Sequence, residues 1–115
     1  MVKDNKRVHT RKYLIADIKI KKTGKSSISA VAVNISREGI GLYTTRPLDQ
    51  REKVIVKMTV LMDGELTASE EIMGIVRWIK PIGKNYCAGI KFDKRIDKAG
   101  YPVIARCITY ASRRS

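Results

Sequence analysis

Residues 54–79 read VIVKMTVLMDGELTASEEIMGIVRWI and place two β-rich runs on either side of an Asp-Gly pair. The first run, Val54 to Met62, is dominated by β-branched and other apolar residues, which is typical of a strand. Asp63-Gly64 is a strong signal for a two-residue hairpin turn, because both residues tolerate a positive φ angle. The second run, Thr67 to Ile79, is then expected to pair back on the first. The sequence therefore predicts an antiparallel hairpin of two long strands.

Shorter runs of the same kind, before and after this hairpin, predict four further strands. Tyr13 to Ile20 alternates well enough to be a half-buried strand, and Ile28 to Ile35 and Ile40 to Thr44 are rich in β-forming residues. Tyr86 to Phe92 follows an expected turn at Pro81–Asn85 and supplies the last strand. Short connections between the runs are typical of a small antiparallel barrel.

The end of the chain changes to helix periodicity, and Pro102 suits the first turn of a helix. We expect a C-terminal amphipathic α-helix over residues 97–112, which covers an opening of the barrel or a partner surface. The predicted fold class is mainly β: a six-stranded antiparallel β-barrel over residues 13–92, in a single domain of residues 1–115. Monomer and homodimer both stay open. The apolar helix positions are Val103, Ile104, Cys107, Ile108 and Ala111.

The charge of the chain is strongly positive. Lys and Arg number 24 against 11 Asp and Glu, which gives a formal net charge of +13. Such an excess attracts polyanions and speeds their capture, but it does not identify the anion. Nucleic acid, acidic lipid, a phosphorylated small molecule and an acidic protein all fit at this point.

Several classes of function find no support in the sequence. No apolar run approaches the roughly 20 residues of a membrane span, and none follows the charged N-terminus as in a secretory signal. Cys87 and Cys107 lie far apart and are expected to be reduced thiols. The single histidine, His9, has no nucleophile nearby, and no Cys or His pair has metal-ligand spacing. We expect a cytoplasmic protein that is not an enzyme, with no catalytic residues, no metal site and no cofactor.

Two arginines stand out in the basic N-terminal segment. Residues 1–12 lack a periodic pattern and are expected to form a flexible arm that carries Arg7 and Arg11, with Lys6 just before them. A guanidinium group is a planar fork of donors that matches phosphate oxygens or the O6 and N7 acceptors of guanine. Two such groups can close over a phosphate-bearing ligand, although a solvated basic tail has the same composition.

A second cluster, Asn34, Ser36 and Gly39, connects two predicted strands. Asn and Ser side chains are short and hydrogen-bond either the local backbone or a ligand. Gly39 is expected to supply a positive φ angle or to let another molecule approach the backbone. Taken alone, this cluster also fits an ordinary hairpin connection.

Together and in this order, the two clusters resemble the motifs of the PilZ domain family, which are Arg-x-x-x-Arg followed by Asp/Asn-x-Ser-x-x-Gly. The resemblance covers nearly the whole chain, because six strands and a terminal helix fit the family's barrel. Residues 74–78 and 86–92 also look like the family's later strands. Both motifs are intact in this chain.

The resemblance implies that the ligand is cyclic di-GMP, which carries phosphates and guanine bases. Arg7 and Arg11 match the family's arginines, which grip phosphates and guanine edges. Asn34 and Ser36 match the residues that hydrogen-bond a guanine. Gly39 completes the turn that shapes their surface.

Lys6, Trp78 and Arg77 lie near these motif residues in sequence or in the predicted fold. Lys6 stands at the position before the first motif, which in the family influences whether one ligand or an intercalated pair is bound. Trp78 either offers a stacking face to a guanine or belongs to the core or the rim of the barrel. Arg77 is expected on the opposite face of the same strand, so that Arg77 and Trp78 would not contact one ligand.

The function implied by the resemblance is a receptor that changes its arm conformation and surface on binding cyclic di-GMP, and so regulates an unidentified protein partner. Two alternatives stay open: a PilZ-like adaptor that binds no nucleotide, and a basic β-barrel that binds nucleic acid. Nucleic-acid-binding barrels usually expose several stacking aromatics on one face, whereas Phe and Trp occur here once each.

Overall fold

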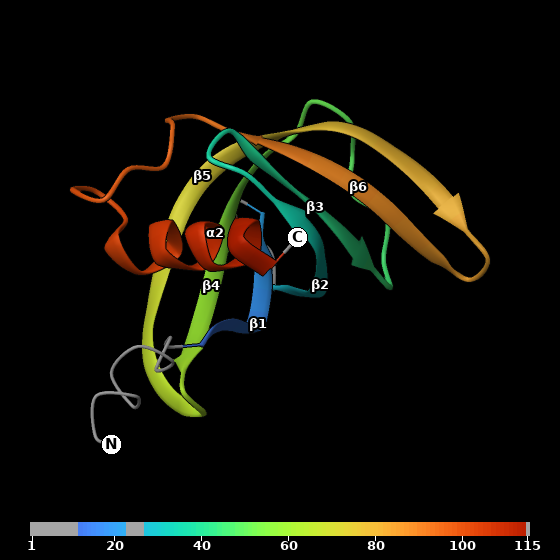
Figure 1. Cartoon of the computed structure of the whole chain (residues 1–115). Helices are drawn as coiled ribbons and strands as arrows, with labels where there is room; N and C mark the ends of the chain where they lie inside the picture. Colours follow the sequence, from blue (N-terminus) through green and yellow to red (C-terminus); the bar gives the residue numbers. More distant parts are fainter. Residues whose placement is uncertain (1–11, 23–26, 115) are drawn as a thin grey trace, which may run out of the picture.

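The computed structural model of the chain describes residues 12–22 and 27–114, with residues 66, 67 and 111–114 described by their backbone alone. Six antiparallel strands form a closed barrel in the order β1-β2-β3-β6-β5-β4, and a helix follows them (Figure 1). The predicted fold class is therefore confirmed. The elements are β1 (Tyr13–Lys21), β2 (Ile28–Ile35), β3 (Gly39–Thr44), β4 (Lys53–Met62), β5 (Glu65–Ile82), β6 (Asn85–Phe92) and α2 (Pro102–Arg114).

The hairpin of β4 and β5 is the longest pairing in the barrel. Its turn is Asp63-Gly64, with φ angles of 53° and 86°, as the sequence predicts. β5 is 18 residues long, and its two halves have different neighbours. Residues 65–75 pair with β4, whereas residues 74–82 pair with β6. β5 therefore belongs to two sides of the barrel.

The turn between β5 and β6 is shorter than expected. It consists of Gly83 and Lys84 alone, and Pro81 remains in β5 opposite Tyr86. A proline is tolerated there because this end of β5 has β6 on one side and has already left β4 on the other. The missing N–H therefore removes no hydrogen bond between β5 and β4.

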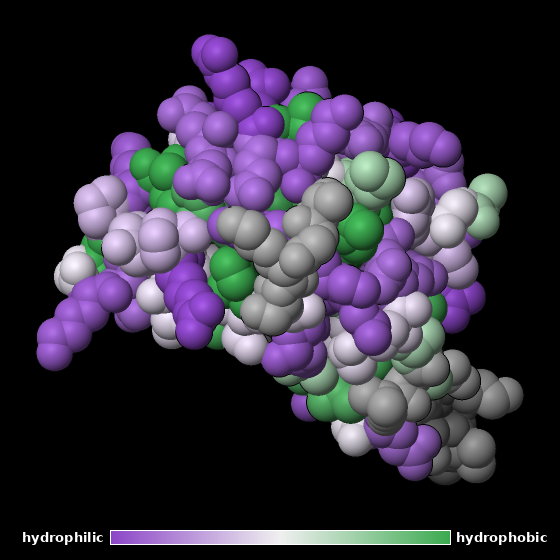
Figure 2. All heavy atoms as spheres, turned by 180° about the vertical axis from the view of Figure 1, so that it is seen from behind, coloured by the Kyte–Doolittle hydropathy of each residue, from purple (hydrophilic) through white to green (hydrophobic). Residues whose placement is uncertain are grey.

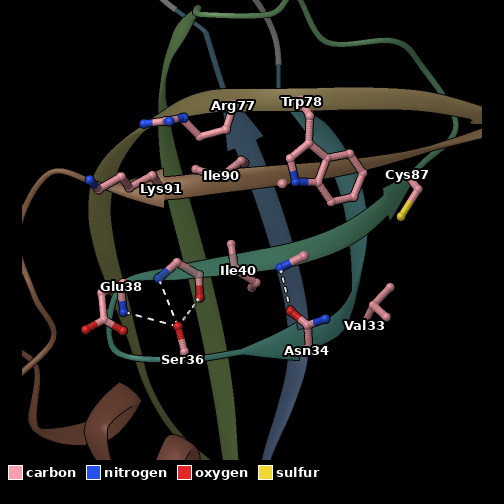
Figure 3. A pocket seen from close by; sticks show the side chains of 13 residues that line it. Val33, Asn34, Ser36, Glu38, Ile40, Arg77, Trp78, Cys87, Ile90 and Lys91 are labelled. Carbon is pink, nitrogen blue, oxygen red and sulfur yellow. Dashed lines mark hydrogen bonds between the residues drawn. The ribbon is translucent and has the colours of Figure 1, made fainter.

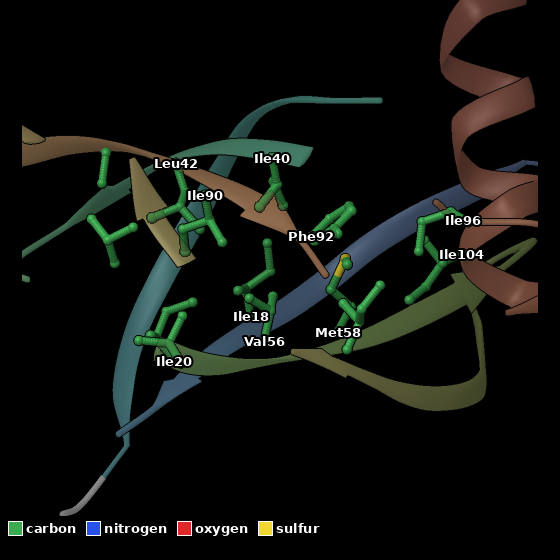
Figure 4. Close-up of a cluster of buried hydrophobic side chains, with 14 of the residues drawn as sticks. Ile18, Ile20, Ile40, Leu42, Val56, Met58, Ile90, Phe92, Ile96 and Ile104 are labelled. Carbon is green, nitrogen blue, oxygen red and sulfur yellow. The ribbon is translucent and has the colours of Figure 1, made fainter. Parts of the chain in front are cut away.

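The interior of the barrel is filled by aliphatic side chains from all six strands and from α2 (Figure 4). Ile20, Leu42, Val56 and Met58 have no exposed surface, and each such burial stabilises the fold by roughly 1.5–3 kcal/mol before entropy is counted. Outside the core the chain is polar. Seen from behind in Figure 2, hydrophilic side chains cover most of the surface, and hydrophobic ones form small separate groups.

Helix α2 begins at Pro102, five residues later than the predicted start at residue 97. The reason is a polar turn: Asp97 Oδ1 accepts a hydrogen bond from the Gly100 N–H at 2.7 Å, and its carbonyl accepts one from the Tyr101 N–H at 2.9 Å. Proline then takes the first helical position, where a missing N–H costs nothing.

Helix α2 closes the barrel where β1 and β2 separate. These strands pair only between residues 18–20 and 28–30. Towards the start of β1 they diverge, and α2 lies between the start of β1 and the end of β2 (Figure 1). Ile104 and Ile108 of α2 join the core, so the apolar face of the helix packs against the barrel. Among the described residues, no helix has the length and apolar character needed to cross a membrane.

Candidate ligand-binding site

A hollow of about 310 Å³ lies on the outside of the barrel, over strands β2, β3, β6 and β5. Glycines form its floor. Gly41 of β3 and Gly89 of β6 are direct partners across the ladder, and Gly39 lies one outward position further along β3. Because none of these outward positions carries a side chain, the surface is lower here than around it. The hollow is therefore a consequence of glycine placement.

A continuous cross-strand row spans the floor. Asn34 of β2 is paired with Gly41, Gly41 with Gly89, and Gly89 with Trp78 of β5. Three strand spacings separate the two ends of the row, a backbone-to-backbone distance of about 14 Å. An amide and an indole thus face each other across two glycines.

Two β-bulges set the rims of the hollow. The register shifts between Ala32 and Asn34 in β2, and again between Val76 and Trp78 in β5. A bulge adds one residue to a strand, so two neighbouring side chains can point to the same side. Accordingly Val33 and Asn34 are both exposed and line the hollow.

The bulge in β5 corrects the expectation for Arg77. Simple alternation would place Arg77 and Trp78 on opposite faces, but both are exposed and both line the hollow (Figure 3). The loop before β4 satisfies the backbone around the bulge. Gln50 Nε2 donates to the Arg77 carbonyl at 3.1 Å, and the Arg51 N–H donates to the Val76 carbonyl at 2.7 Å.

Asn34 leans over the floor. Its Oδ1 accepts a hydrogen bond from the Gly41 N–H at 3.2 Å, and a Cβ at residue 41 would lie 2.9 Å from that oxygen. Within the part of the chain that the structure describes, the Asn34 amide nitrogen makes no hydrogen bond, so its two N–H groups are available to a ligand.

Ser36 organises the turn between β2 and β3. Its Oγ accepts hydrogen bonds from the backbone N–H groups of Glu38 at 3.2 Å and Gly39 at 3.3 Å. Gly39 does not have a positive φ angle, so that part of the expectation is wrong. Glycine is needed there because a Cβ would lie 2.4 Å from the Ile90 carbonyl oxygen of β6. The close approach is to the neighbouring strand.

The same turn is tied to the segment after β6. Arg37 Nη1 donates to the Ile96 carbonyl at 2.8 Å, and the Ile96 N–H donates back to the Arg37 carbonyl at 2.9 Å. Glu38 forms an ion pair with Arg95. Arg37 and Glu38 are therefore both held by contacts to the segment after β6.

Trp78 lies on the outside of the barrel and not in its core. The indole covers Gly89, because a Cβ at residue 89 would lie 2.2 Å from Trp78 Nε1. The side chain is 42% exposed, and Lys80 Nζ is 6.0 Å from the ring centroid. An exposed indole over a glycine floor gives a flat apolar surface at one end of the hollow.

The electrostatic character of the hollow is cationic. Arg77 and Lys91 line it from β5 and β6, and the acidic lining residue Glu38 is paired with Arg95 (Figure 3). Sequence reasoning missed Lys91 and the glycines at 41 and 89. Such cations attract a phosphate or another anion.

The residues Lys6, Arg7 and Arg11 lie outside the described residues. The chain leading to them is fixed at Lys12, whose N–H donates to Asp63 Oδ1 and whose carbonyl accepts from the Asp63 N–H, both at 2.9 Å. β1 and β2 are antiparallel but diverge towards the start of β1. Lys12 therefore lies beside the turn of the β4–β5 hairpin, and α2 lies between it and the turn after β2 (Figure 1).

The described residues near the hollow do not form a metal site. Among residues 12–22 and 27–114, no three His, Cys, Asp or Glu side chains gather so that they could hold a metal ion. Burial raises the pKa of the Cys107 thiol to about 11, and the nearby charge of Glu70 adds to this shift. Cys107 belongs to α2 and does not line the hollow.

Comparison with known proteins gives one family. The family model described as the PilZ domain matches residues 5–110, which includes both motifs and nearly all of the barrel and helix. No curated protein matches the chain.

Proposed function

The chain belongs to the PilZ domain family, which is known for cyclic di-GMP binding, and from that premise we propose that it is a cyclic di-GMP receptor without catalytic activity. The observation that carries the proposal is the cross-strand row of Asn34, Gly41, Gly89 and Trp78. It offers the N–H donors of Asn34 over Gly41 and the indole face of Trp78 over Gly89 in one line.

A guanine base fits the chemistry of this row. Its edge carries the acceptors O6 and N7, which the amide N–H groups of Asn34 can meet. Its ring system can lie on the glycine floor and stack against Trp78, which contributes roughly 1–3 kcal/mol for each stacked base. Ser36 shapes the turn beside the row, and we propose that its hydroxyl also contacts the ligand.

The phosphates of the ligand require cations from more than one part of the chain. Arg77 and Lys91 already line the hollow. We propose that Arg7 and Arg11 complete the site from the N-terminal segment, and that Lys6 helps to set whether one ligand or two are bound. The five residues from Lys12 back to Arg7 span at most about 17 Å. That is enough to pass a helix of roughly 10–12 Å diameter such as α2.

The proposed mechanism is a change of surface. Cyclic di-GMP would bridge the N-terminal segment and the hollow, neutralise positive charge at both, and select one arrangement of the segment. A protein partner would then read the new surface. We place this receptor in the bacterial cytoplasm, where the two free thiols of Cys87 and Cys107 suit a reducing compartment.

Calorimetric titration of the purified chain with cyclic di-GMP tests the proposal, with GTP as the ligand control. We expect micromolar or tighter binding, about 8 kcal/mol, and at least tenfold weaker binding by Arg11→Ala. Lys57→Ala is the matched control, because it removes one positive charge from β4, away from the hollow.

The outcomes separate the alternatives. Absence of binding by the native chain would overturn the receptor proposal and favour an adaptor. Tight, strongly salt-dependent binding of single-stranded nucleic acid without binding of the dinucleotide would assign the chain to the nucleic-acid-binding class. The stoichiometry of a positive titration distinguishes one ligand from an intercalated pair.

A further inference from the structure

Exposed apolar side chains gather beside the hollow. Seven large hydrophobic residues are prominently exposed among those described, and five of them lie on the side of the barrel that carries the hollow. Contiguous exposed apolar surface marks an interaction site more often than scattered single residues do. We call this set the outer apolar patch; it comprises Val31, Val33, Tyr43, Trp78 and Ile82.

The register of the strands brings four of the five patch residues together, and Ile82 lies two residues beyond Lys80 on β5. Val31 pairs with Tyr43, Tyr43 with Cys87, and Cys87 with Lys80, which gives a second row parallel to the row of the hollow. Side chains directly opposite each other in such a ladder lie about 5 Å apart. Val33 is the extra residue of the bulge in β2, and Trp78 ends the first row two residues before Lys80. Figure 3 shows Val33 and Trp78 at the edge of the hollow together with Cys87.

The charges around the patch are of one sign. Strands β2, β3 and β6, together with residues 76–82 of β5, contain no Asp or Glu. They carry Arg77, Lys80 and Lys91, and Lys84 occupies the turn at the end of the β5–β6 hairpin. Lys80 stands beside the indole of Trp78 at 6.0 Å from the ring centroid. The charged residues of these strand segments are thus all cations.

We propose that the outer apolar patch docks a segment of another protein that combines apolar side chains with flanking carboxylates. The apolar side chains would cover Val31, Tyr43 and Ile82, and the carboxylates would meet Lys80 and Lys84. Electrostatic complementarity of this kind sets orientation and speeds encounter. A second copy of the chain would bring an identical cationic border against the first, and the chain's own N-terminal segment is also basic. The positive charge of a second copy and that of the N-terminal segment are therefore both repelled by the cations beside the patch.

The test is a selection of random displayed peptides on the purified full chain, without any nucleotide present. We expect the selected peptides to be enriched in Asp and Glu next to apolar residues. One of them is then synthesised with a fluorescent label and its affinity is measured by anisotropy. Val31→Ser combined with Tyr43→Ser should weaken binding at least tenfold. Leu14→Ser, which changes an equally exposed apolar residue on β1, should alter it less than twofold.

A charge exchange makes the assignment specific. Lys80→Glu should weaken the binding of the acidic peptide. It should strengthen the binding of a second peptide in which lysines replace the carboxylates. Selected peptides without acidic enrichment, or affinities that survive the Val31 and Tyr43 changes, would overturn the proposal. Dimers in sedimentation that disappear with the same two changes would overturn it in favour of self-association. Because no nucleotide is present, these results do not depend on the cyclic di-GMP titration.

Discussion

Two sides of the barrel share one core and differ in what they show to solvent. The glycine wall consists of β2, β3, β6 and the second half of β5, and it carries the hollow and the outer apolar patch. The mixed-charge wall consists of β1, β4 and the first half of β5. This wall carries both acids and bases, with an Asp17–Lys19 ion pair at 3.8 Å and a hydrogen bond between the hydroxyls of Thr59 and Ser69 at 2.8 Å.

The difference shows how the proposed binding surface can be added to a barrel without altering its interior. On the mixed-charge wall the outward positions carry ordinary side chains, which include exposed apolar ones such as Leu14 and Met73. On the glycine wall, side chains are omitted at Gly41 and Gly89 and doubled at the two bulges. Inward positions such as Leu42 and Val76 remain buried under the site. Binding chemistry and core packing are thus assigned to different residues of the same strands.

The largest effect is expected from closing the tightest contact of the glycine wall with the backbone of a neighbouring strand. Gly39→Ala would place a Cβ 2.4 Å from the Ile90 carbonyl oxygen, and the backbone cannot move away without breaking the β3–β6 ladder. We expect it to lower the free energy of unfolding by more than about 3 kcal/mol, measured by urea denaturation. Gly64→Ala, in the hairpin of the mixed-charge wall, meets no atom within 4 Å and should cost about 1 kcal/mol, from its positive φ alone. Equal losses would contradict the comparison.

An intermediate effect on the free energy of unfolding is expected from the ionisation of Cys107, and Cys87 serves as the comparison. Cys87 lies half-buried on the glycine wall, whereas Cys107 is buried on α2 near Glu70 of the mixed-charge wall. The pKa of Cys107 is raised from 9.0 to about 11, so the folded chain keeps a proton that the unfolded chain releases. The free energy of unfolding should therefore fall by about 2 kcal/mol between pH 9 and pH 11 because of this group.

Denaturation across this pH range checks the prediction, with Cys107→Ala as the comparison. The variant should be less stable at neutral pH but should lose less stability on going to high pH. Identical slopes for the two proteins would contradict the raised pKa. Alkylation at about pH 8 gives an independent readout, since Cys87 should react and Cys107 should not.

The smallest loss of stability is expected from a variant at Gly89, which should nevertheless bind the ligand clearly less tightly. Gly89→Ala would place a Cβ 2.2 Å from Trp78 Nε1, but a side chain can swing aside where a backbone cannot. We expect less than about 1 kcal/mol of lost stability and about tenfold weaker cyclic di-GMP binding, equivalent to about 1.4 kcal/mol. Trp78→Ala should give a similar loss of affinity, and the double variant should lose little more. Additive losses would show that Gly89 and Trp78 act separately.

Much of the fold could be predicted because burial leaves a direct trace in the pattern. Strand β4 buries alternate side chains, and Asp63-Gly64 forms the predicted turn. The start of α2 was misplaced for a physical reason: apolar spacing marks the buried face of a helix but not its first turn. A side chain such as that of Asp97 can hold the preceding residues in a separate turn.

The site was only partly predictable, because a bulge belongs to a pair of strands and not to one. Asn34, Ser36 and Gly39 are brought together as their motif suggests, and Trp78 lines the same hollow. Arg77 was misplaced because strict alternation was assumed through the bulge. Isolated glycines inside strand patterns, such as Gly41, are the signal that could have located the floor.

The bulge in β5 also has an evolutionary consequence. Arg77 is the extra residue: Val76 pairs with Ile90 and Trp78 with Gly89, so the ladder has no partner position for it. We therefore expect that loss of the single codon for Arg77 would return β5 to plain alternation and leave every core residue in place. One deletion of this kind removes a cation from the hollow without rebuilding the protein. A lineage can gain or discard a cation of the hollow in one genetic step while the barrel is inherited unchanged.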